Sequence, residues 1–131
     1  MNEISVDLKQ HLYIWLKSLP FLKHRNLRRE FSDANLVAKL VNFFMPKLAL
    51  ENAYPPCMSM TKKIDNWTRL NAKVLSHLGL NISKENIEDL ASSKVNVTEK
   101  FLLKLATVLY AINQVQIKEA INQMQKTGGQ F

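Results

Sequence analysis

Basic side chains gather in one short stretch near the N-terminus. Between residues 17 and 29 the chain carries five Lys or Arg residues and no Asp or Glu. Cations without carboxylates close to them in sequence project a positive field toward a partner of opposite charge. We therefore predict a binding site for an acidic polymer. This first basic set consists of Lys17, Lys23, Arg25, Arg28 and Arg29.

A second basic set follows farther along the chain. It consists of Lys62, Lys63, Arg69 and Lys73. Arg69 and Lys73 are four residues apart and Lys62 stands seven before Arg69, so these three share one face of a helix. A run of charge often marks only a solvated surface, and that interpretation competes with a binding site for both sets.

The residue types that support catalysis are sparse and scattered. An enzyme needs a nucleophile beside a base, paired carboxylates or a metal cluster. The histidines, His11, His24 and His77, stand far apart, and Cys57 is the single cysteine, which excludes an internal disulfide. No basic residue lies close enough to Cys57 in sequence to lower its pKa, so we expect a partly buried packing residue. The sequence predicts a protein that is not an enzyme, with no cofactor and no metal site.

Composition describes one basic, globular unit. The chain has 131 residues, 47% of them hydrophobic, and a net charge of +7. Residues 1–80 hold 12 basic and six acidic side chains, so the interaction face is expected in this part. No segment approaches the 18 apolar residues of a membrane span, and residues 1–5 do not resemble a secretory signal. We expect a protein of the cytoplasm.

Hydrophobic periodicity predicts an all-α fold. The expected helices cover residues 8–19, 32–45, 61–78 and 83–90, followed by a long helix from residue 98. Ser32 or Asp33 is expected to cap the second helix, and Gly79 to end the third in a left-handed conformation. The apolar stripe of the last helix weakens beyond Asn113 and reaches Val115.

Two further expectations concern packing. Residues 47–60 contain two adjacent prolines and little periodicity, which predicts an ordered loop pinned by Leu48, Leu50 and Tyr54. Trp15 and Trp67 lie on apolar helix faces, so we expect them in the core and not as stacking platforms for bases.

Several segments together resemble the sperm-flagellar type of calponin-homology domain over roughly residues 5–115. The segments are 12–15 through Pro20, Arg25-Asn26-Leu27, Phe31-Ser32-Asp33, Phe43-Phe44-Met45-Pro46-Lys47, Asn66-Trp67, Leu70-Asn71 and Val74-Leu75. The resemblance implies a compact helical domain, usually at the N-terminus of a longer protein that binds and bundles microtubules in cilia and flagella. Ala34 stands where the wider pattern commonly has Gly, and we expect it to tighten the start of its helix.

The resemblance also implies a partner and a site. We expect a microtubule-binding module whose contacts are made first by Arg25, Arg28 and Arg29. The supporting charges are Lys17, Lys23, Lys62, Lys63 and Arg69. The expected location is the cytoskeleton of the axoneme, and the expected state is a monomer as this chain and a dimer in a longer parent. Residues 1–115 are predicted to form the domain and 116–131 a polar helical extension with a frayed tail.

Other partners are weighed against microtubules. One alternative is an adaptor that binds another protein, for example an axonemal one, through its apolar edge and makes no contact with microtubules. Actin is a second, although the actin-binding relatives carry two such domains in tandem and this chain carries one. A basic protein with a sequence pI of about 9.6 could bind nucleic acid, but the sequence contains no recognised nucleic-acid-binding motif. We expect no nucleic-acid and no membrane partner.

Overall fold

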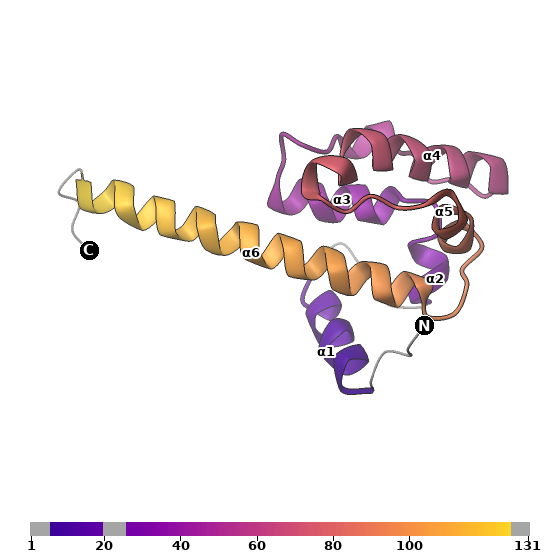
Figure 1. Cartoon of the computed structure of the whole chain (residues 1–131), viewed down its shortest axis with the longest axis horizontal. Coiled ribbons are helices and arrows are strands. Elements are labelled where there is room, and N and C mark those ends of the chain that lie inside the picture. Colours follow the sequence, from indigo (N-terminus) through magenta and orange to yellow (C-terminus); the bar gives the residue numbers. More distant parts are fainter. Residues whose placement is uncertain (1–5, 20–25, 127–131) are drawn as a thin grey trace.

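The described part of the protein, residues 6–19 and 26–126 of a computed structural model, is all-α and contains no strand. A long C-terminal helix dominates it (Figure 1). The α-helices are α1 Val6–Lys17, α2 Leu27–Glu30, α3 Asn35–Phe44, α4 Met60–Lys73, α5 Lys84–Ala91 and α6 Val97–Lys126, with 3₁₀ turns η1 Glu51–Ala53 and η2 Leu75–Leu78. The fold class predicted from periodicity is confirmed.

Helix α6 organises the packing. Its N-terminal half contacts α1, α2, α3 and α5, whereas its C-terminal half extends beyond the other helices (Figure 1). The buried face of α6 includes Leu102, Leu105 and Leu109, while Val115 is 54% exposed, so the predicted stripe leaves the core before its last member. No helix in residues 6–19 or 26–126 is long and apolar enough to cross a bilayer.

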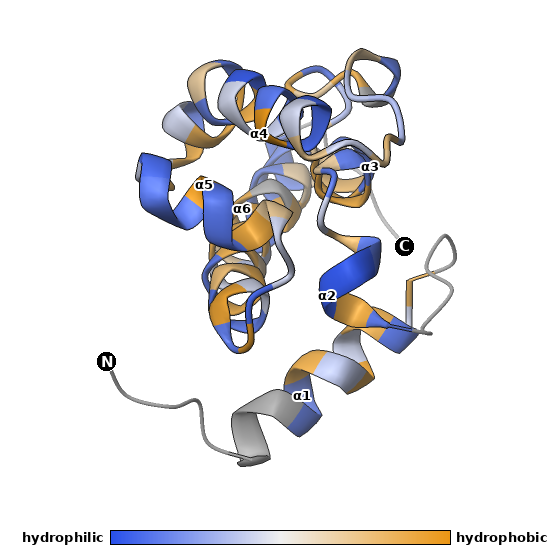
Figure 2. Ribbon diagram, turned by 90° about the vertical axis from the view of Figure 1, so that its right-hand side faces the viewer, coloured by the Kyte–Doolittle hydropathy of each residue, from blue (hydrophilic) through white to orange (hydrophobic). Residues whose placement is uncertain are grey.

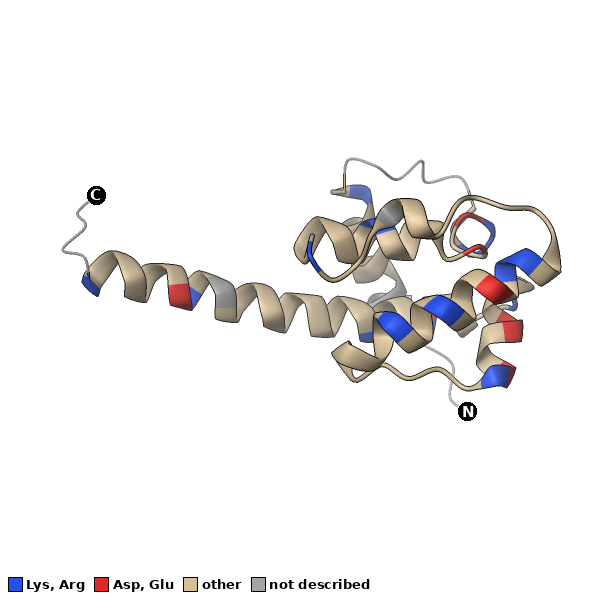
Figure 3. Ribbon diagram, turned by 90° about the horizontal axis from the view of Figure 1, so that it is seen from above, with Lys and Arg blue, Asp and Glu red and all other residues tan. Residues whose placement is uncertain are grey.

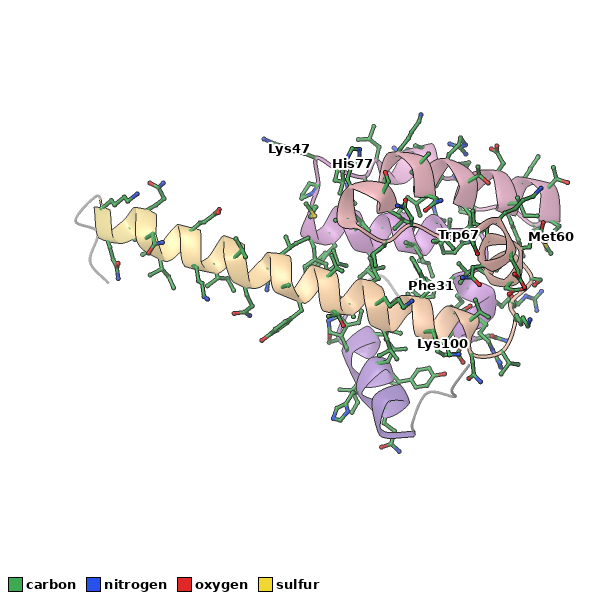
Figure 4. All side chains as sticks on the ribbon, in the orientation of Figure 1. Phe31, Lys47, Met60, Trp67, His77 and Lys100 are labelled. Carbon is green, nitrogen blue, oxygen red and sulfur yellow. The ribbon has the colours of Figure 1, made fainter. Side chains whose placement is uncertain are left out.

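Trp67 lies at the centre of the core, as predicted. Its side chain is 0% exposed, and its indole ring meets Phe101 edge-on at 5.4 Å between ring centroids. The indole N–H donates to the Ser32 carbonyl at 2.8 Å. Figure 4 shows Trp67 and Phe31 between the helices. Trp15 is only half-buried, stacked on Phe44.

Local chemistry places several helix ends where the sequence predicts them. Gly79 ends η2 with φ 73°, in the left-handed region that glycine adopts without strain. The Ser83 hydroxyl accepts from the Asn86 N–H and caps α5. In contrast, α4 ends at Lys73, and the turn η2 completes the segment that was expected to be one helix.

The start of α3 differs from the prediction. Neither Ser32 nor Asp33 occupies the N-cap: Ala34 does, with φ 67° and no side-chain hydrogen bond to the helix. The Asp33 carboxylate instead accepts from the Asn35 N–H at 3.0 Å. The expectation that Ala34 tightens the helix start is wrong, because a left-handed backbone strains every residue that has a Cβ.

The segment between α3 and α4 is mostly as expected. Tyr54 is buried and Leu48 is half-buried, so both pin the loop to the core. Leu50 is 69% exposed, and its predicted anchoring role is wrong.

Helices α2 and α5 are mostly hydrophilic. Figure 2 shows hydrophilic residues along both helices, including the basic residues of α2.

Candidate functional site

The polar residues of the resemblance motifs hold the scaffold together. The Asn66 side chain is 3% exposed, and its amide N–H groups donate to the carbonyls of Asp33 and Pro55, each at 2.9 Å. Asn71 exchanges two hydrogen bonds with the backbone of Ile82. These bonds tie α4 to the turn before α3, to the loop before α4 and to the loop before α5. They fix the positions of the charged residues around α4.

Helix α2 presents two of the predicted arginines. The Asn26 side chain caps this four-residue helix by accepting from the Arg29 N–H at 3.3 Å. Leu27 packs against the core, which leaves Arg28 half-buried and Arg29 exposed. The Ser93 hydroxyl donates to the Arg28 carbonyl at 3.2 Å and so joins α2 to the connection between α5 and α6.

Arg28 and Arg29 share a cavity with Lys63 of α4. The cavity has a volume of about 410 Å³, and none of the described residues that line it is Asp or Glu. None of the three cations forms an ion pair with a carboxylate of the described residues. Its other lining residues are Asn26, Met60, Ala91, Ser92, Ser93 and Val95. The structure thus joins members of the two basic sets, and we call Arg28, Arg29 and Lys63 the basic face.

The remaining members of the second set point elsewhere. Lys62 and Arg69 line a neighbouring cavity of about 570 Å³ that also contains Asp65. The Asp65 carboxylate lies 3.0 Å from the Arg69 guanidinium and offsets part of the local positive charge. Asp65 is the one acidic residue of α4, and Figure 3 shows that basic residues predominate along this helix. Lys73 ends α4 at an exposed position.

Arg69 is engaged inside the domain. Besides its ion pair, the guanidinium donates to the Ala53 carbonyl at 2.8 Å and to the Asn66 side-chain oxygen at 2.7 Å. It also lies over the Tyr54 ring, 5.2 Å from the centroid. Burial raises the pKa of the Tyr54 hydroxyl, and the nearby Arg69 charge partly opposes that rise. These contacts give Arg69 a bracing role at the end of the loop before α4.

Three residues of the first set lie away from this arrangement or outside the described residues. Lys17 is the exposed last residue of α1 and lines neither cavity. Lys23, Arg25 and His24 fall in residues 20–25, outside the described residues. The contact roles of Lys17, Lys23 and Arg25 stay predictions.

The connection between α5 and α6 contributes residues that sequence reasoning missed. Ser92, Ser93 and Val95 line the cavity beside the two arginines. Ser93 and Asn96 have φ values of 62° and 71°, so this connection holds a backbone shape that non-glycine residues seldom adopt. No charge or periodicity marks these positions, and only the packing of α5 and α6 beside α2 reveals them.

Nothing in the described residues supplies the chemistry of a metal site or an activated thiol. No group of three or more His, Cys, Asp or Glu side chains in residues 6–19 and 26–126 could hold a metal ion. Burial raises the pKa of the half-buried Cys57 thiol, with a further rise from Asp33, while Lys63 and Lys62 oppose it weakly. The expectation of a partly buried packing residue is confirmed.

Comparisons with known proteins place the chain in a family. The family model described as a CH-like domain in sperm protein matches residues 12–107. Sperm flagellar protein 1 of Xenopus laevis is 39% identical over 101 residues, which are 76% of this chain and 44% of that protein. The Bos taurus protein of the same name is 33% identical over 130 residues, or 98% of this chain and 55% of that protein.

The Mus musculus protein of that name is 37% identical over 106 residues, which are 79% of this chain and 45% of its own length. The chain therefore spans about half the length of the curated relatives it matches. The family is one of structural proteins and not of enzymes, in agreement with the sequence prediction. From the family match over most of its length, the chain belongs to the calponin-homology-like domains of sperm proteins.

Proposed function

We propose that this domain binds microtubules by docking its basic face, Arg28, Arg29 and Lys63, on their acidic surface. The observation that carries the proposal is the meeting of these cations from α2 and α4 around one cavity, where the part of the chain that the structure describes contributes no carboxylate. Cationic side chains brought together in this way repel one another, and an anionic partner relieves that repulsion by neutralising their charge. The name of the relatives, sperm flagellar protein 1, supports a place in the flagellar cytoskeleton, which we extend to the axoneme and its cytoplasm.

Charge alone does not account for tight binding. Exposed ion pairs contribute about 0.2–1 kcal/mol each, so three of them supply at most about 3 kcal/mol. A micromolar complex needs roughly 8 kcal/mol. Apolar contacts from Met60 and Val95, which are 46% and 62% exposed at the cavity, would add to the charge term. A second domain in a dimeric parent protein would raise the effective concentration to roughly millimolar and convert weak binding into bundling.

Co-pelleting with stabilised microtubules tests the proposal, with actin filaments in parallel and each at two salt concentrations. We expect the domain to pellet with microtubules, and less so at the higher salt because exposed charges are screened within about 8 Å at physiological ionic strength. Arg29→Glu should weaken binding about tenfold, since it removes one favourable contact and adds a repulsive one. Lys126→Glu, at the end of α6, makes the same change in net charge and should have little effect.

The two variants separate a site from general charge. Equal losses for Arg29→Glu and Lys126→Glu would show that net charge is responsible, and affinity independent of salt would contradict the electrostatic account. Pelleting with actin alone would reassign the filament. Circular dichroism of each variant checks that the fold is kept, as expected for an exposed side chain.

An adaptor function is the second candidate, and exposed apolar side chains favour it. Ile14 on α1 is 66% exposed and Phe43 on α3 is 53% exposed. The Phe43 ring meets Phe44, whose ring stacks on Trp15 of α1, so α1 and α3 share an aromatic edge. If neither filament pellets the domain, and Ile14→Ser abolishes capture of a protein from ciliated cells that the wild type retains, the adaptor function is correct.

A further inference from the structure

We infer that the cavity beside the basic face binds the glutamate side chain of an extended acidic segment, with the α5–α6 connection as its apolar wall. This inference rests on the proposed function and adds the kind of surface that the domain recognises on its partner. The occupant is a glutamate-rich stretch of polypeptide in an extended conformation on the surface of that partner.

The size and chemistry of the cavity carry the first step. Its volume of about 410 Å³ is large enough to receive a carboxylate side chain, and the cavity is open to solvent, so a chain lying across α2 and α4 reaches it directly. Arg28 and Arg29 each offer a planar fork of N–H donors that matches a carboxylate, and Lys63 adds a third cation from the opposite helix. An extended chain is able to insert one side chain at a time between α2 and α4.

The wall of the cavity favours Glu over Asp. Val95 is 62% exposed and Met60 is 46% exposed, and both line the cavity beside the cations. Met60 lies at the N-terminal end of α4 (Figure 4). The longer aliphatic part of Glu would pack against these side chains while its carboxylate reaches the arginines. One more buried methylene group corresponds to about a fourfold gain in affinity when it is fully buried.

The wall is fixed in place before a partner arrives. Ser93 and Asn96 hold left-handed backbone angles, and the Ser93 hydroxyl bonds the Arg28 carbonyl at 3.2 Å. The same residue therefore shapes the connection and links it to α2. A site that is already formed spends less of its interaction free energy on ordering when it binds.

Nuclear magnetic resonance of the ¹⁵N-labelled chain, titrated with acetylated hexaglutamate amide and with hexaaspartate amide, tests the inference. We expect the largest shifts at residues 28–29, 60–63 and 91–95, with tighter binding of the glutamate peptide. Lys63→Glu should weaken the affinity about tenfold. Lys73→Glu makes the same change at an exposed position of the same helix, outside this cavity, and should have little effect. Val95→Ser should remove the preference for glutamate and keep the affinity for aspartate.

Each contrary result removes a definite part of the inference. Equal weakening by Lys63→Glu and Lys73→Glu, or shifts spread over the whole domain, would show that the cavity is not the site. Equal affinity for the two peptides would refute the apolar wall. If the chain pellets with microtubules but neither peptide shifts a resonance, the inference fails and the proposed function stands. If the glutamate peptide binds and microtubules do not, the proposed function fails and the inference stands.

Discussion

The left-handed backbone of Ala34 leads to a stability prediction that can be worked out from the structure. Ala34 is 0% exposed and has φ 67° at the start of α3. Its carbonyl accepts from the Ala38 N–H at 3.0 Å, so the strained residue is part of the first turn of the helix. The left-handed conformation costs a non-glycine residue about 1–2 kcal/mol. Ala34→Gly removes that cost.

Two losses oppose this gain. Removing a buried methyl group costs about 0.8 kcal/mol, and glycine makes the unfolded chain more flexible, at about 0.4–1 kcal/mol. We therefore expect the Ala34→Gly change to leave the free energy of unfolding within about 0.8 kcal/mol of the wild type. Ala38 is the matched control, since it is also 0% exposed and lies in the regular part of α3. Ala38→Gly loses a buried methyl and about 1 kcal/mol of helix propensity, or about 2 kcal/mol in all.

Urea unfolding followed by far-ultraviolet circular dichroism measures both variants. The midpoint for Ala34→Gly should remain near that of the wild type, whereas the midpoint for Ala38→Gly should fall clearly, with similar slopes. If the two variants lose equal stability, residue 34 does not carry the backbone strain assigned to it. The difference between the variants is the decisive quantity because both remove one buried methyl group.

The other predictions concern the loop before α4. Arg69→Met should lower the free energy of unfolding by about 1–2 kcal/mol, because it leaves the Ala53 carbonyl and the Asn66 oxygen without their donor. The control, Lys73→Met on the same helix, should change the free energy of unfolding by less than about 0.5 kcal/mol. Equal losses for the two variants in urea unfolding would contradict the bracing role of Arg69. Burial raises the pKa of the Cys57 thiol, so it ionises at higher pH in the folded protein than in the unfolded chain and its contribution to stability falls as pH rises above the unfolded pKa. Iodoacetamide should accordingly modify the native thiol more slowly than the urea-unfolded one at the same mildly alkaline pH, and equal rates would contradict the raised pKa.

Elements that depend on local chemistry were predictable from the sequence. Gly79 and Ser83 mark helix ends by properties of their own backbone or side chain, and Trp67 belongs to an apolar stripe that needs burial wherever the helix packs. The cap of α3 was not predictable in this way. Trp67 and Asn66 bond the carbonyls of Ser32 and Asp33, and these distant bonds hold a turn in which Ala34 takes the strained position.

The candidate site was predictable only in part, for the same reason. Sequence reasoning marked Arg28, Arg29 and Lys63 by their charge but assigned them to separate sets, because nothing local indicates that α2 and α4 meet at one cavity. It counted Arg69 among the supporting charges, since the bond from its guanidinium to the Ala53 carbonyl forms only when the loop before α4 folds onto that helix. Val95 carries no charge, so its place beside the arginines had no signal in the sequence.

This dependence on packing makes the basic face a property of the folded domain. The hydroxyl of Ser93 and the carbonyl of Arg28 are joined across 65 positions of sequence, and Lys63 reaches the same cavity only because α4 is held by Asn66 and Trp67. An unfolded chain keeps the net charge of +7 but scatters these cations. The unfolded chain should therefore still be attracted to an acidic polymer. In the folded protein Lys63→Glu should weaken binding more than Lys73→Glu does, and this difference should disappear when the chain unfolds. That difference distinguishes a binding site from a basic protein.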